Sequence, residues 1–230
     1  MLDVKNLHSG YGDVEVLRDV SFTVENEIFA VLGANGAGKT TLLKTLAKLI
    51  PVSAGSIAWQ GRDITNAAAF ELAKQGIAYV PQEQNVFPDL SVAENLSLGA
   101  LVGTRSKSER LEEVFELFPR LAERQGQSAD SLSGGEGQML AVGRALMQDP
   151  SVILLDEPSA GLSPMFVDIL FEKISDTRTD RGVTIVLAEQ NAVKTLEIAD
   201  RLLVLSLGEI HLLGEAKKLS REQLMEAYHI

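Results

Sequence analysis

A glycine-rich stretch near the start of the chain has the residue types and spacing of a phosphate-binding loop. It reads GANGAGKT and matches the pattern G-x-x-x-x-G-K-[ST]. Small residues let successive backbone N–H groups curl around a phosphate, Lys39 can reach the β- and γ-phosphates of a nucleotide, and the Thr40 hydroxyl can bind Mg²⁺. The alternative is a glycine-rich turn without a ligand, which the preceding apolar run, the spacing and the lysine together disfavour. We expect nucleotide contacts along Gly33, Ala34, Asn35, Gly36, Ala37, Gly38, Lys39, Thr40 and Thr41.

Two carboxylates end a second apolar run, VILLDEP. Charges at the end of a buried strand are costly when they stand alone, so they favour a metal ion or a water network nearby. Asp156 is placed to hold Mg²⁺, directly or through water, and Glu157 can act as the general base toward an attacking water. The alternative is that the two carboxylates are only the solvated end of a strand. The presence of the phosphate loop in the same chain favours the roles in metal binding and catalysis.

A second glycine motif, LSGGEGQ, precedes the apolar-periodic stretch MLAVGRALM. A serine followed by two glycines at a helix start, here Ser133, Gly134 and Gly135, can bind an anion through backbone N–H groups. A plain helix cap explains the same residues at least as well. A nucleotide bound by a single chain needs only one such loop. The first loop already supplies it, so a site formed by one chain leaves this second loop without a role.

A polar triplet, Glu189, Gln190 and Asn191, follows the apolar run TIVLA. The run predicts a strand that neighbours the one ending in Asp156, because the two follow each other in an alternating pattern. Position alone leaves two interpretations of Gln190: the solvated end of a strand, or a side chain that faces a ligand.

Short runs rich in Val and Ile recur along the chain, separated by helical stretches such as KTTLLKTLAKLI and PMFVDILFEKI. Such runs indicate strands buried on both faces of a parallel sheet, and their alternation with helices predicts an α/β domain. We expect strands at residues 28–33, 77–81, 152–156, 184–188 and 201–206.

Other regions depart from this alternation. The first 30 residues alternate in polarity between turn signals, which predicts an antiparallel meander. Residues 91–128 are charged, helical in period and without a strand pattern, so we expect a helical insertion there. Ser220 and Gln223 fit a capping box that starts a short final helix.

The chain has 230 residues, of which 45% are apolar, so it can bury a sizeable core. Its net charge of −11 makes it a poor candidate for sequence-independent binding of nucleic acid, whose phosphates it would repel. Without cysteine it can form no disulfide, Cys-ligated zinc site or thiol nucleophile. We expect neither a signal peptide nor a membrane helix, since no run approaches ~20 apolar residues.

The order of three motifs carries a resemblance to a known family. A phosphate loop, then LSGGE, then VILLDEP some twenty residues later resembles the ATP-binding subunit of ABC transporters over nearly the whole chain. The resemblance implies a P-loop NTPase (RecA-like) core with an N-terminal antiparallel β-subdomain, in residues 1–84 and 141–230. It also implies an inserted α-helical subdomain at residues 85–140 that carries the signature loop.

The same resemblance explains the second loop. In that family two ATPase subunits pack head to tail, and each ATP lies between one subunit's phosphate loop and the other's LSGGE. Ser133 and Gly135 would then contact the γ-phosphate held by the second subunit. ATP and Mg²⁺ are the implied ligands, and transmembrane permease subunits, with a solute-binding protein beyond them, are the implied partners.

Further residues match family positions only through the resemblance. Tyr11 matches the aromatic residue that stacks on adenine, and Gln82 matches the glutamine that touches Mg²⁺ and the attacking water. The segment SAGLSP, residues 159–164, matches the loop that crosses the dimer interface, although Ser163 stands where the family commonly has Asp.

Gln190 occupies the position where the family most often has His. Its amide can hydrogen-bond the γ-phosphate or orient water, but it cannot carry charge or shuttle a proton near neutral pH. The resemblance thus implies a γ-phosphate contact and a catalytic contribution for Gln190 beside Lys39, and leaves Glu157 as the general base.

The branch within the family is indicated by longer stretches such as GIAYVPQEQNVFPDLSVAENLSLGA and DEPSAGLSP. They resemble the ATPases of branched-chain amino-acid importers, which work from the cytoplasmic face of the cell membrane. Importers of urea or amides and a lipopolysaccharide-type exporter are the alternatives within transport. A non-transport ABC ATPase and a regulatory module that holds ATP without hydrolysis are the others, and the presence of Glu157 disfavours the regulatory module.

Overall fold

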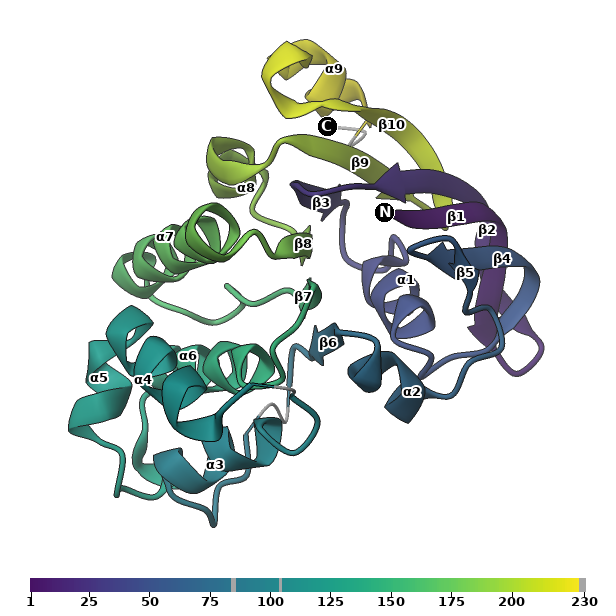
Figure 1. Cartoon of the computed structure of the whole chain (residues 1–230). Coiled ribbons are helices and arrows are strands. Elements are labelled where there is room, and N and C mark those ends of the chain that lie inside the picture. The colour runs from purple at the N-terminus through teal and green to yellow at the C-terminus, as the bar shows by residue number, and fades with distance from the viewer. Residues whose placement is uncertain (84–85, 104, 228–230) are drawn as a thin grey trace.

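The computed structural model describes residues 1–83, 86–103 and 105–227, and it contains two sheets. The larger has six strands in the order β10-β9-β3-β8-β7-β6 (Figure 1). The four neighbouring pairs from β9 to β6 are parallel, and β10 pairs antiparallel with β9. All five predicted strands are confirmed as β3 (Ile28–Leu32), β6 (Ile77–Val80), β7 (Val152–Asp156), β8 (Thr184–Glu189) and β9 (Arg201–Ser206), with β10 at Glu209–Glu215.

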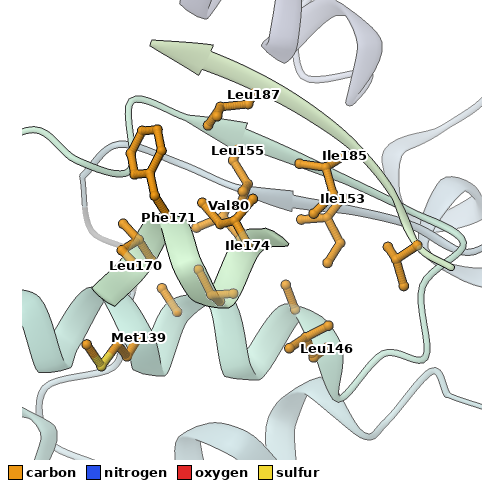
Figure 2. Packing of buried hydrophobic residues seen from close by; sticks show 14 of the residues in the cluster. Val80, Met139, Leu146, Ile153, Leu155, Leu170, Phe171, Ile174, Ile185 and Leu187 are labelled. Atoms are coloured by element: carbon orange, nitrogen blue, oxygen red, sulfur yellow. The ribbon is translucent and has the colours of Figure 1, made fainter. Parts of the chain in front are cut away.

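The strands are apolar throughout because helices or a second sheet cover both of their faces. Residues alternate between the two faces along each strand, so Ile153 and Leu155 point to one side while Val152 and Leu154 point to the other. Figure 2 shows the first side, where side chains of α6 (Gly134–Leu146) and α7 (Pro164–Arg181) pack on β6, β7 and β8.

A smaller antiparallel sheet covers the opposite side together with α1 (Lys39–Leu46), which contacts strands of both sheets. The predicted antiparallel pairing in the first 30 residues is confirmed by β1 and β2. Two further strands join them that the sequence analysis missed, since the Ser, Ala and Gly residues of the first lack a strand pattern and the second has only two residues. The sheet contains β2 (Val14–Val24), β1 (Leu2–Tyr11), β4 (Val52–Trp59) and β5 (Arg62–Asp63), in this order.

The helical insertion is confirmed in the described part of residues 91–128, which forms helices and one isolated bridge but no named strand. The proposed subdomain border between residues 84 and 85 falls outside the described residues.

Ser220 and Gln223 form the predicted capping box, with their backbone N–H groups each donating to the other's side chain. Within the described residues, no helix is long and apolar enough to cross a membrane. The remaining helices are α2 (Ala69–Lys74), α3 (Val92–Gly99), α4 (Lys107–Leu117), α5 (Pro119–Glu123), η1 (Ala129–Ser131), α8 (Ala192–Ile198), η2 (Ala216–Lys218) and α9 (Arg221–Ala227).

One buried amide organises the segment that enters the helical insertion. Asn95 of α3 is fully buried, and its Oδ1 accepts from the backbone N–H of Phe87 at 2.8 Å. Its Nδ2 donates to the carbonyls of Phe87, Leu90 and Ser91 at 2.9, 3.3 and 3.0 Å. One side chain thus bonds four backbone groups of this turn, whose three carbonyls also accept from the backbone N–H groups of Leu90, Ala129 and Asn95.

Replacing Asn95 with Ala should lower the free energy of unfolding by about 2 kcal/mol, because the backbone N–H of Phe87 and three carbonyls each lose a hydrogen bond to this buried amide. Urea unfolding of the purified chain measures this. Asn66→Ala, at an exposed turn position, is the control and should leave stability nearly unchanged. A loss below about 0.5 kcal/mol for Asn95→Ala would contradict the organising role of this amide.

Candidate functional site

Three polar segments meet at one edge of the large sheet. The strands β3, β8 and β7 lie side by side in parallel, with β8 in the middle, so their carboxyl ends share one edge. The predicted neighbour relation between the strands that end in Asp156 and Glu189 is confirmed, and Asp156 pairs in register with Ala188. Ligands of open α/β sheets bind at such an edge.

The phosphate loop follows β3 and leads into α1. Gly36 and Gly38 have φ angles of 80° and 108°, and Gly38 is the residue that starts the helix. A Cβ at Gly33 would come within 2.4 Å of the carbonyl oxygen of Leu205, so only glycine fits there. This backbone shape and the helix start that follows give the loop the character of an anion site.

Lys39 lies at the centre of the loop and is 3% exposed. Its Nζ donates to the carbonyls of Gly33 and Ala34 at 2.8 and 3.2 Å and forms an ion pair with Glu157 Oε1 at 2.9 Å. The second oxygen of Glu157 accepts from Gln82 Nε2 at 3.0 Å. The structure therefore brings together Lys39, Gln82 and Glu157, from three segments far apart in the sequence.

Asp156 is buried beside this group and has a partner for each oxygen. Oδ1 accepts from the Thr40 hydroxyl at 3.0 Å, and Oδ2 accepts from the Tyr79 hydroxyl at 3.1 Å. Burial raises the pKa of Asp156 above its ordinary value, although both hydrogen bonds act in the opposite direction. Burial and the charge of Asp156 also raise the pKa of Tyr79, so its hydroxyl keeps the proton that it donates.

The oxygen atoms of Thr40 and Asp156 suit a hard divalent cation. Mg²⁺ in nucleotide sites is held by one or two protein oxygens together with substrate phosphates, rather than by an all-protein cluster. In keeping with this, residues 1–83, 86–103 and 105–227 contain no group of three or more His, Cys, Asp or Glu residues that could hold a metal. The donor set fits Mg²⁺ once phosphate oxygens complete it.

At the end of β8 the neighbouring polar residues differ in environment. Gln190 is exposed, whereas Glu189 is buried and accepts from the backbone N–H groups of Ser159 and Gln190. Asn191 accepts from the backbone N–H of Lys194 and caps α8. The sequence analysis assigned no role to Tyr79 or Glu189. The only signal available was a polar residue inside or at the end of an apolar strand, which marks the position but not its partner.

Other expected site residues lie apart from this group. Ser133 caps α6, where it exchanges hydrogen bonds with Glu136, and Gly135 packs against the ring of Phe166. Among the described residues, no hydrogen bond or ion pair connects Ser133 to the phosphate loop. Tyr11 ends β1 with 49% of its surface exposed, and Ser163 starts α7 without a side-chain capping bond.

Glu136 holds the signature loop in this arrangement. Its carboxylate accepts from the backbone N–H of Ser133 at 3.0 Å and pairs with Arg124 Nε at 3.1 Å. Burial acts to raise the pKa of Glu136, but the hydrogen bonds from Ser133 and the charges of Arg124 and Arg120 outweigh it, so the pKa lies below its ordinary value. Glu136 is therefore ionised near neutral pH.

Comparison with known proteins identifies relatives along the full length. The high-affinity branched-chain amino acid transport ATP-binding protein BraG of Pseudomonas aeruginosa is 43% identical, with 99% of each chain covered. The probable branched-chain amino acid transport ATP-binding protein LivF of Archaeoglobus fulgidus is 40% identical, covering 98% of this chain and 97% of LivF. The lipopolysaccharide export system ATP-binding protein LptB of Haemophilus influenzae is 34% identical, covering 99% and 96%.

Among solved structures, the ADP conformation of an ATP-binding cassette from an ABC transporter superimposes with a TM-score of 0.86. It is 27% identical and covers 100% of this chain and 98% of that one. This likeness confirms the expected P-loop NTPase fold. The family described as ABC transporter matches residues 17–160. The chain belongs to the ABC transporter family.

Proposed function

We propose that this chain is the ATP-hydrolysing subunit of a transporter that imports branched-chain amino acids. The observation that carries the proposal is the site at the edge of β3, β8 and β7, where a phosphate loop, a buried aspartate and a glutamate paired with the loop lysine meet. The solute follows from BraG and LivF, whose names include branched-chain amino acid transport and whose identity exceeds that of LptB. The exporter therefore remains the second candidate.

ATP would bind with its phosphates in the loop Gly33–Thr41 and its adenine on Tyr11. The two backbone carbonyls that accept from Lys39 keep its ammonium at the mouth of the loop. A γ-phosphate offers this ammonium a stronger anionic partner than Glu157, because the phosphate carries more charge. Binding would then free Glu157 from its ion pair.

Mg²⁺ would be held by Thr40 and Asp156, with Gln82 close to the same place. When bound, the metal neutralises charge on the transferring phosphoryl group. The Tyr79 hydroxyl keeps the carboxylate of Asp156 oriented, as outer partners of metal ligands do.

Hydrolysis would use Glu157 as the general base. Its carboxylate, held by Gln82, can accept a proton from water that attacks the γ-phosphate. Gln190 would contact the γ-phosphate from the end of β8, and Lys39 would stabilise the charge that develops there. Gln190 cannot titrate near neutral pH, which leaves Glu157 as the base.

The site would be completed by a second ATPase subunit. Ser133, Gly134 and Gly135 lie at a helix start apart from their own chain's phosphate loop, as a contact to a partner's nucleotide requires. We place the nucleotide-binding core at residues 1–84 and 141–230 and the helical subdomain at 85–140. Permease subunits would bind the chain at the cytoplasmic face of the membrane.

Glu157→Gln should abolish steady-state ATP hydrolysis and trap an ATP-bound dimer, because ATP still binds while the base is lost. Phosphate release and light scattering measure the two effects. Asp168→Asn, on the exposed start of α7, is the control and should hydrolyse ATP normally. Steady turnover by Glu157→Gln would refute the base assignment, and a stable dimer of the wild-type chain without ATP would refute the ATP-dependent pairing.

Gln190→Ala should lower kcat by roughly 100-fold or more, the order of loss expected when a positioned hydrogen-bond donor is removed from the group on which charge develops. Gln190→His should retain much of the activity, because the imidazole can still donate a hydrogen bond. Initial rates of ATP hydrolysis at saturating ATP give kcat for the wild type and for both variants. Full activity in the alanine variant would mean that Gln190 is only the solvated end of a strand.

The solute assignment is tested by uptake. In cells that depend on this chain, Glu157→Gln should abolish uptake of labelled leucine, isoleucine and valine, because transport needs ATP turnover. Asp168→Asn is again the control. Unchanged uptake of all three amino acids, with a loss of lipopolysaccharide at the cell surface, would favour the exporter.

A further inference from the structure

Glu189 is a buried carboxylate that the proposed chemistry does not use. It ends β8 and is 2% exposed. Its Oε1 accepts from the backbone N–H of Ser159 at 2.9 Å, and its Oε2 accepts from the backbone N–H of Gln190 at 3.2 Å. A buried charge is costly unless it is hydrogen-bonded, so the hydrogen-bond partners of this carboxylate indicate its role.

These partners belong to two different segments. Ser159 lies two residues beyond Glu157, in the turn that follows β7, whereas Gln190 follows β8. The carboxylate therefore joins the segment of the expected base to the segment of the expected γ-phosphate contact. Neither of its oxygens is bonded to Lys39, Gln82 or Asp156.

The turn after β7 needs such support. Glu157 has a φ angle of 44°, in the left-handed region that a residue with a side chain seldom adopts. Its backbone N–H donates to the carbonyl of Ala188 at 2.9 Å, and the N–H of Ala160 donates to its carbonyl at 3.1 Å. The end of β8 thus holds the turn twice, through the backbone of Ala188 and through the side chain of Glu189.

A carboxylate is suited to this place because both of its oxygens accept hydrogen bonds. An amide of the same shape has one acceptor oxygen and would turn an NH₂ group toward the other backbone N–H. Burial raises the pKa of Glu189, while hydrogen bonds from Ser159, Asn191 and Gln190 favour its charged form. The side chain of Ser159 and three backbone N–H groups thus surround the carboxylate as donors.

We propose that Glu189 is a positioning residue that fixes Glu157 and Gln190 relative to each other across the γ-phosphate. This inference rests on the proposed function, since it assumes that these two residues act on ATP. In this role Glu189 would touch neither substrate nor metal. It acts through backbone N–H groups, so it should affect the chemical step and leave nucleotide binding to the phosphate loop.

The first test is Glu189→Gln in the full-length chain. We expect kcat to fall at least about tenfold, because small displacements of reacting groups are costly, while KM changes little. Glu197→Gln, the same change on an exposed carboxylate of α8, is the matched control and should keep both constants. A kcat within about twofold of wild type would overturn the proposal. So would equal losses in nucleotide affinity and kcat, which indicate general damage to the fold.

The second test measures hydrogen exchange without nucleotide, so it does not depend on ATP turnover. In Glu189→Gln, amides of residues 157–163 and 189–191 should exchange faster than in wild type, while those of α1 stay unchanged. Unchanged exchange in both segments would overturn the proposed link even if kcat fell. If exchange rises as expected but the wild-type chain hydrolyses no ATP, the link holds and the proposed function fails.

Discussion

The position of β8 between β3 and β7 is the constraint on which the site depends. Each of the three strands is a buried run that is mostly apolar. At the same edge of the sheet, β3 leads into the phosphate loop, while β7 and β8 end in the carboxylates Asp156 and Glu189. The phosphate loop therefore meets Asp156 although Thr40 and Asp156 are 116 residues apart in the sequence, and Gln190 follows the strand between them. Both faces of this sheet are hydrophobic because helices or the smaller sheet cover them.

The charged side chains at this edge have ion-pair or hydrogen-bond partners within the chain. Lys39 is paired with Glu157 and with two backbone carbonyls, and each oxygen of Asp156 has a hydroxyl partner. Buried charges with such partners can be retained at low cost. The same pairs define the chemistry, because a phosphate that takes over Lys39 releases the carboxylate that must act as base. Structure and proposed mechanism thus depend on the same contacts.

Much of this arrangement could be predicted from local sequence patterns. The five buried strands, the phosphate loop and the acidic pair each have a distinct run or spacing. β4 and β5 were missed because the Ser, Ala and Gly residues of β4 form no strand pattern and β5 has only two residues. β4 pairs with β1, and β5 pairs with β4.

The roles of Tyr79 and Glu189 could not be predicted in the same way, because their partners are set by strand register. Tyr79 reaches Asp156 from the neighbouring strand β6, where it pairs with Leu154, and Glu189 reaches Ser159 across the end of β7. Sequence spacing carries no information on such contacts. Similarly, the role of Ser133 in a second copy came from the family resemblance and not from its residue type.

The central claim is that nucleotide replaces Glu157 as the partner of Lys39 and is then enclosed by a second copy. A crystal structure of Glu157→Gln with ATP and Mg²⁺ tests it most directly. We expect a dimer in which Lys39 contacts the γ-phosphate, with residues 133–135 of the other copy on the far side of the same phosphate. ATP bound with Lys39 still turned toward residue 157, or with residues 133–135 of both copies facing solvent, would contradict the account.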